Sequence, residues 1–137
     1  MDGFQFVIPY SVHVADVNYG GHVANSAVLN FFQDARIRFL AELGPFAEMK
    51  IGEDCGIIQS EAHVYYRAEM FLHDELKIGV RVSEKKRSSF SLAYRIERDG
   101  QLTAEGTTTL AGFSYSRGKI VRLPEPFRAA LVDFQKE

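Results

Sequence analysis

The most informative stretch of the chain is DVNYGGHVAN (residues 16–25), which runs directly into the apolar stretch NSAVLNFFQDARIRFLAEL (residues 25–43). It places a carboxylate, two amides, a histidine and a Gly-Gly turn at the start of a helix. Such a turn frees backbone N–H groups, and a helix start carries a partial positive charge. This environment suits a carbonyl that must become an oxyanion, with side chains nearby to move protons or hold water. A strand-to-helix connection with polar caps explains the same residues without any chemistry.

The apolar residues of segment 25–43 repeat with the period of a helix that buries one side. One helical stripe holds Val28, Leu29, Phe31, Phe32, Ala35, Phe39 and Leu43. Gly44-Pro45 follows, and this pair is typical of a helix end. Arg36 falls inside the stripe, so we expect it to pair with a carboxylate or to extend its head group to solvent.

The rest of the chain shows mostly the alternation of strands. Strands are expected over residues 4–14, 56–67, 76–82, 90–96, 102–115 and 120–123. Asp99-Gly100 predicts a tight hairpin, and Pro126 suits the first turn of a short final helix. Only segment 25–43 is long enough to cover the apolar face of a sheet. The sequence therefore predicts an α+β fold, with an antiparallel sheet curled around one central helix.

Length and composition bound the class of protein. A chain of 137 residues with 46% hydrophobic and 25% charged residues is ordinary for one globular domain over residues 1–137. A net charge of -2 offers no basic surface, which argues against nucleic acid as a partner. The single cysteine, Cys55, excludes an internal disulfide and suits a reducing compartment. With no secretion signal and no apolar stretch of about 20 residues, we expect a cytoplasmic protein without a membrane partner.

Several short motifs occur in a characteristic order. They are GHVAN (21–25), DAR (34–36), SSF (88–90), DGQLTAEG (99–106) and LPEPF (123–127). With this architecture, the chain resembles the hotdog-fold acyl-CoA thioesterases of the 4-hydroxybenzoyl-CoA thioesterase type. The resemblance covers nearly the whole chain and implies hydrolysis of an acyl-CoA or acyl-carrier thioester, with no metal or redox cofactor. Exposed strand edges and leftover apolar surface favour pairing with a second copy, so a homodimer or a dimer of dimers (homotetramer) is expected.

The chain departs from the family at one position. Aligned on Gly21-His22, the acidic residue that many members use as base or nucleophile falls on Asn18. An amide neither accepts a catalytic proton nor forms the anhydride that a carboxylate can form. Asn18 can still hydrogen-bond a water molecule or the thioester carbonyl. The expected reaction is therefore direct attack by water.

Three residues are candidates for the missing base. Asp16 is either a base that acts through one water or a turn aspartate that accepts local N–H groups. His22 at the helix start is either a base that orients water or a packing residue. Asp34 lies on the helix side opposite the apolar stripe, where it can face the site of a partner subunit.

Other residues are candidates for holding the substrate. The backbone of Gly20, Gly21 and His22 is expected to hold the oxyanion, and Tyr19 to wall the acyl pocket. Asn25 is either the helix N-cap or a substrate-positioning amide. Ser88 and Ser89 follow the basic run 85–87, which is either a phosphate-binding turn or a solvated one. His13, His63, His73 and Cys55 show no metal-ligand spacing, so no metal site is expected.

Two other functions fit the same fold. Asp16-Val17-Asn18 is similar to the Asp-x-Asn run of MaoC-type hydratases, although His22 follows later than the histidine of that family. A hotdog-fold enoyl-CoA hydratase or dehydratase is therefore one alternative. Because Asn18 replaces an acid, a non-catalytic acyl-CoA-binding protein is the other.

Overall fold

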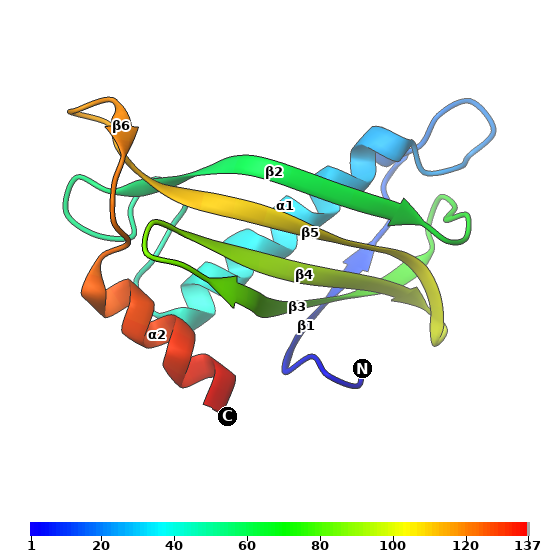
Figure 1. The fold of residues 1–137 in the computed structure, drawn as a ribbon. Coiled ribbons are helices and arrows are strands. Elements are labelled where there is room, and N and C mark those ends of the chain that lie inside the picture. Colours follow the sequence, from blue (N-terminus) through cyan, green and yellow to red (C-terminus); the bar gives the residue numbers. More distant parts are fainter. Residues whose placement is uncertain (137) are drawn as a thin grey trace.

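A long helix lies across one face of an antiparallel sheet in the computed structural model, which describes residues 1–136 (Figure 1). Within those residues the helix is α1 (Asn25–Leu43) and the sheet has six strands. The strand order is β1 (Phe6–Ser11), β3 (Glu75–Lys85), β4 (Ser89–Arg98), β5 (Gln101–Ser114) and β2 (Gly56–Tyr66), and β6 (Lys119–Ile120) also pairs with β5. The helix α2 (Glu125–Lys136) ends the described chain. The predicted α+β architecture is confirmed.

Local sequence accounts for the central meander of β3, β4 and β5. The alternating residues of β3 and β4 bury one side of each strand, with Ile78, Val80, Leu92 and Ile96 at 0% exposure. Asp99 and Gly100 both have a positive φ, of 51° and 80°, as a two-residue hairpin turn requires. The predicted hairpin is confirmed, and the meander forms the surface against which α1 packs.

The core lies between this sheet face and α1. Val28, Phe32, Ala35 and Phe39 are buried as predicted, but Leu29 is 37% exposed. Ile37, nearer the other end of α1, is 47% exposed, although α2 packs at that end, where the rings of Phe39 and Phe134 lie 5.1 Å apart (Figure 1). The helix therefore keeps two large apolar side chains, Leu29 and Ile37, partly in solvent.

Arg36 confirms the expectation of a carboxylate partner. Its side chain is 5% exposed, and its Nε donates to Glu48 Oε2 at 2.9 Å. Its Nη1 donates to the Tyr94 hydroxyl at 3.1 Å, and that hydroxyl lies 2.6 Å from Thr108 Oγ1. The charge is thus neutralised inside the core by groups from the α1–β2 connection and from the sheet.

Two expected strands are shorter than predicted. The expected strand over 4–14 is reduced to β1, and a short 3-10 helix, η1 (Val14–Asp16), follows it. Asp16 Oδ2 accepts the N–H of His13 at 2.9 Å, which stabilises this turn in place of further strand. The expected strand over 120–123 is reduced to the end of β6. Among the described residues, no helix has the length and apolar character needed to cross a membrane.

Candidate functional site

A cavity of about 530 Å³ lies where α1 begins and β2 ends. Its walls come from the segment 18–28, from the end of β2 and from the connection that follows β2. The lining residues are Asn18, His22, Val23, Asn25, Val28, Tyr66, Arg67, Ala68, Glu69 and Met70. The structure therefore brings together three of the predicted site residues, Asn18, His22 and Asn25, in one cavity.

The Gly-Gly turn is closed by its own backbone. The Asn18 carbonyl accepts the N–H groups of Gly20 at 3.2 Å and Gly21 at 3.1 Å, and Gly21 has a φ of 77°. The prediction that these two N–H groups are free for an oxyanion is therefore wrong for this conformation. The turn instead presents the His22 side chain to the cavity.

The start of α1 also differs from the prediction. The N-cap is Ala24, which makes no side-chain cap, so Asn25 is the first helical residue and not the cap. Its side chain is free to face the cavity that it lines, while its carbonyl accepts the Tyr66 hydroxyl at 3.0 Å. The Ala27 N–H donates to the Ala24 carbonyl at 2.9 Å, but the N–H groups of Asn25 and Ser26 come before any intrahelical acceptor, so the helix start gives this wall a positive potential.

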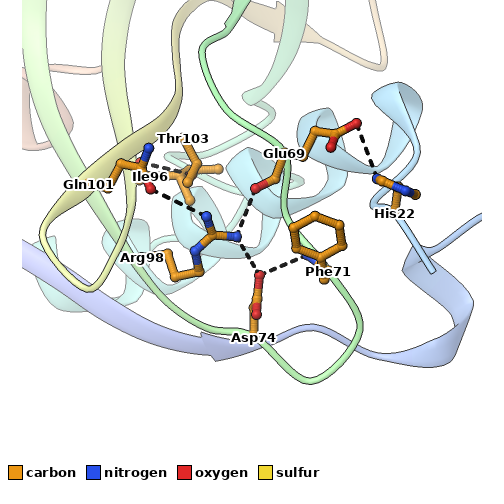
Figure 2. A network of polar contacts seen from close by, with 8 residues as sticks. All are labelled: His22, Glu69, Phe71, Asp74, Ile96, Arg98, Gln101 and Thr103. Carbon is orange, nitrogen blue, oxygen red and sulfur yellow. Dashed lines mark hydrogen bonds and ion pairs between the residues drawn. The ribbon is translucent and has the colours of Figure 1, made fainter. Parts of the chain in front are cut away.

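The connection between β2 and β3 supplies the opposite wall. The Val23 N–H donates to the Met70 carbonyl at 2.8 Å, and the Leu72 N–H donates to the Gly21 carbonyl at 3.0 Å. These bonds place His22 opposite Phe71, and the two rings lie 4.9 Å apart. On the same connection, Glu69 Oε1 lies 3.2 Å from His22 Nδ1 (Figure 2).

Arg98, at the end of β4, ties this connection to the sheet. Its Nη1 donates at 2.8 Å both to the Glu69 carbonyl and to Asp74 Oδ2 (Figure 2). Asp74 Oδ2 also accepts the Phe71 N–H at 2.8 Å, and the guanidinium lies over the Phe71 ring. One arginine therefore holds both the Glu69 backbone and Phe71, the residue whose ring contacts His22.

The carboxylate of Asp16 lies outside the cavity lining. It accepts the Tyr10 hydroxyl at 2.7 Å as well as the His13 N–H, and its side chain is 14% exposed. Burial raises the pKa of Tyr10, and the hydrogen bond to Asp16 raises it further. The Asp34 charge also raises the pKa of Tyr10, so both predicted carboxylates act on this one phenol. Asp34 pairs with Arg38 Nη2 at 3.5 Å on the surface of α1.

The remaining predicted residues lie elsewhere. Tyr19 is fully exposed and does not line the cavity. Ser89 pairs in register with Ala111, which pairs with Ile58 at the start of β2, whereas Tyr66 at the cavity ends β2. By strand rise, Ser88 and Ser89 are therefore about 25 Å from the cavity of the same chain. Among residues 1–136, no three His, Cys, Asp or Glu side chains converge as a metal site.

Replacing Asp16 with asparagine is expected to affect folding more than turnover. The amide oxygen still accepts one donor, but the charge that strengthens both hydrogen bonds is lost, so we expect destabilisation by about 1 kcal/mol. Because Asp16 does not line the cavity, kcat should fall by less than about threefold, a change too small for loss of a general base. Urea unfolding and steady-state thioester hydrolysis measure the two effects. If Asp16→Asn were fully folded but lost turnover, Asp16 would be the general base.

Sequence reasoning missed Glu69, and no periodic signal could have found it. The residue follows the predicted strand 56–67, in a segment where apolar and polar residues do not alternate. It lies 47 positions after His22, and the segments of the two residues meet only through an isolated bridge between His22 and Phe71, outside the regular strands. Only the two backbone bonds between the connection and the Gly-Gly turn bring the two side chains together.

Comparison with known proteins gives a consistent result. A sequence model of the Thioesterase-like superfamily matches residues 12–131. Acyl-CoA thioesterase YbgC of Haemophilus influenzae is 27% identical over 131 residues, which is 94% of each chain. A thioesterase of Thermus thermophilus, solved with coenzyme A and zinc, has a TM-score of 0.88 at 26% identity over 100% of this chain and 98% of that one. A 1,4-dihydroxy-2-naphthoyl-CoA thioesterase from Synechocystis shares the fold, with a TM-score of 0.85 at 21% identity over 95% and 97% of the two chains.

Proposed function

Since this chain belongs to the thioesterase-like superfamily, we propose that residues 1–137 form one catalytic domain that hydrolyses acyl-CoA thioesters to a carboxylic acid and free coenzyme A. The family match over residues 12–131 is the observation that carries this proposal. The similarity to an acyl-CoA thioesterase over 94% of the chain supports the coenzyme A ester as the substrate. The cavity at the start of α1 is where we place the reaction.

The side chains of the cavity support direct attack by water. Asn18 holds the water by hydrogen bonding, and His22 accepts its proton as the water oxygen bonds to the thioester carbon. The carbonyl oxygen becomes an oxyanion, which the positive start of α1 stabilises. When the carbonyl re-forms, the C–S bond breaks and the thiolate takes the proton from His22. The products are the acid and the thiol, and no acyl-enzyme is formed.

We place the second subunit of a homodimer on the edge of β2. This strand is last in the main order of the sheet, and its 11 residues have one edge without a partner strand among the described residues. Tyr65 and Tyr66 are 52% and 50% exposed there. A long unpaired strand with exposed aromatic side chains is a surface that a second chain can cover.

Antiparallel pairing of two β2 strands would also bring Ser88 and Ser89, which are predicted to bind substrate, near a cavity. It reverses the partner, so that the start of its β2 lies beside the end of β2 in the first chain. Ser89 of the partner subunit, which is level with the start of β2, would then lie near the cavity of the first chain. There the basic run 85–87 can meet the phosphates of coenzyme A.

Release of free thiol from short, medium, long and aromatic acyl-CoA esters tests the function. Turnover on at least one ester is expected. Loss of enoyl absorbance from crotonyl-CoA, without thiol release, would instead establish a hydratase. Saturable binding of these esters without turnover on any of them would establish a binding protein and would contradict the proposal.

Sedimentation equilibrium tests the pairing of subunits. We expect a mass twice the 15.5 kDa of one chain, or four times that mass if two dimers associate. A monomer at micromolar concentration would contradict the assignment of the β2 edge as an interface.

A further inference from the structure

We propose that Glu69 is the positioning carboxylate of His22, and that this pair supplies the proton acceptor that Asn18 no longer provides. The proposal rests on the thioester hydrolysis proposed above. Glu69 would act through His22 without touching the substrate. It would hold the ring proton on Nδ1, so that the lone pair of Nε2 faces the attacking water.

The two nitrogens of His22 have different surroundings. Nδ1 is screened from solvent and makes no well-aligned hydrogen bond within the described chain. Glu69 Oε1 nevertheless lies 3.2 Å from it, close enough for a hydrogen bond after a small rotation of the exposed Glu69 side chain. A shielded nitrogen beside a carboxylate favours the tautomer in which that nitrogen carries the proton. Nε2, on the other side of the ring, is then the acceptor.

The imidazole ring is held in one orientation. It packs on Phe71 at an interplanar angle of 53°. Gly20 leaves room for its other edge, since a Cβ there would lie 3.1 Å from Cδ2 and 3.6 Å from Nε2. A catalytic base needs such a fixed orientation toward the proton that it accepts.

The charged groups around the pair come from three elements. The β2–β3 connection carries Arg67, Glu69 and Asp74, and β4 carries Arg98. The third element is β5, whose Glu105 pairs with Arg67 at 2.9 Å. Arg98 is neutralised by Asp74, and it contacts Glu69 only through the backbone carbonyl. The Glu69 carboxylate is therefore available to His22. If it were bound to Arg98, it would not be.

Glu69 is suited to a clean test because it contributes little to folding. Its side chain is 69% exposed, and an exposed ion pair adds little stability. Glu69→Gln should therefore fold normally. We expect kcat to fall about tenfold with KM unchanged. This is at the lower end of the effect of removing a carboxylate that orients a histidine, because solvent screens the charge of Glu69. Glu42→Gln, exposed at the other end of α1, is the matched control and should keep the wild-type kcat.

The same change in a His22→Gln background separates positioning from a general electrostatic effect. If Glu69 acts through His22, Glu69→Gln has no further effect on kcat once the histidine is gone. A tenfold loss that persists in this background, or wild-type kcat in the single variant, would overturn the proposal.

A second measurement does not depend on turnover. Nitrogen-15 chemical shifts of His22 report which ring nitrogen carries the proton. We expect the Nδ1–H tautomer in the wild type and loss of that preference in Glu69→Gln. An Nε2–H tautomer in the wild type would refute the pair even if thioesters are hydrolysed. An Nδ1–H tautomer without turnover on any ester would refute the thioesterase and leave the pair intact.

Discussion

Replacing His22 with glutamine is expected to lower kcat for acyl-CoA hydrolysis by about a hundredfold, with little change in KM. Glutamine retains hydrogen-bonding atoms of similar reach, but its amide does not take a proton from water, and general-base catalysis contributes about 10²–10⁴ in rate. The side chain is 41% exposed, so its replacement should leave the fold intact. Thiol release at saturating and limiting ester concentrations measures kcat and KM separately.

A control histidine is available in the same segment of the chain. His13 is 68% exposed and lies outside the cavity lining, so His13→Gln should retain wild-type turnover. If His22→Gln kept full kcat while Asp16→Asn or Asp34→Asn lost it, the base would be that carboxylate. Full activity in all three variants would place the base outside the predicted set.

Replacing Arg36 with methionine is expected to destabilise the protein by about 3 kcal/mol, a drop of about 10 °C in Tm. Methionine keeps most of the buried volume. It leaves Glu48 without its charged partner and removes the donor to the Tyr94 hydroxyl, which is itself buried. Removing one partner of a buried pair is costly because the remaining charge stays poorly solvated. Urea unfolding at fixed protein concentration measures the change, since subunit pairing also affects stability.

Arg38 is the matched control, two positions along the same helix. Its pair with Asp34 is on the surface, where the arginine side chain is 50% exposed, so Arg38→Met should cost less than about 0.5 kcal/mol. Adding Glu48→Gln to Arg36→Met should recover part of the lost stability, because it removes the unpaired charge. Equal costs for Arg36→Met and Arg38→Met would show that the buried network is not important for folding.

Much of the fold could be predicted because the signals are local. The bounds of α1 follow from the apolar period of segment 25–43 and from Gly44-Pro45, and the structure confirms both ends. The β4–β5 hairpin follows from two residues that readily adopt a positive φ. Such signals depend on neighbours within one turn or one hairpin, so they can be interpreted without knowing how the rest of the chain folds.

The order of the strands could not be predicted in the same way. The segment of β2 precedes that of β3 in the chain, yet β2 pairs with β5 and forms an edge of the sheet. Alternation shows that a segment is a strand, but it carries no information about which strand lies beside it. The edge proposed for the second subunit is therefore a result of topology.

For the candidate site, the sequence by itself determined that Asn18, His22 and Asn25 lie together at the start of a helix, because a tight turn and a first helical turn join them over eight residues. Tertiary structure decided which carboxylate accompanies them. In the folded chain, the Asp16 carboxylate accepts the Tyr10 hydroxyl. Glu69 lies beside His22 because the backbones of two segments about fifty residues apart are hydrogen-bonded to each other. The physical reason is that a carboxylate is directed by the donors that happen to surround it. Those donors belong to strands and connections whose neighbours are set only when the whole sheet forms.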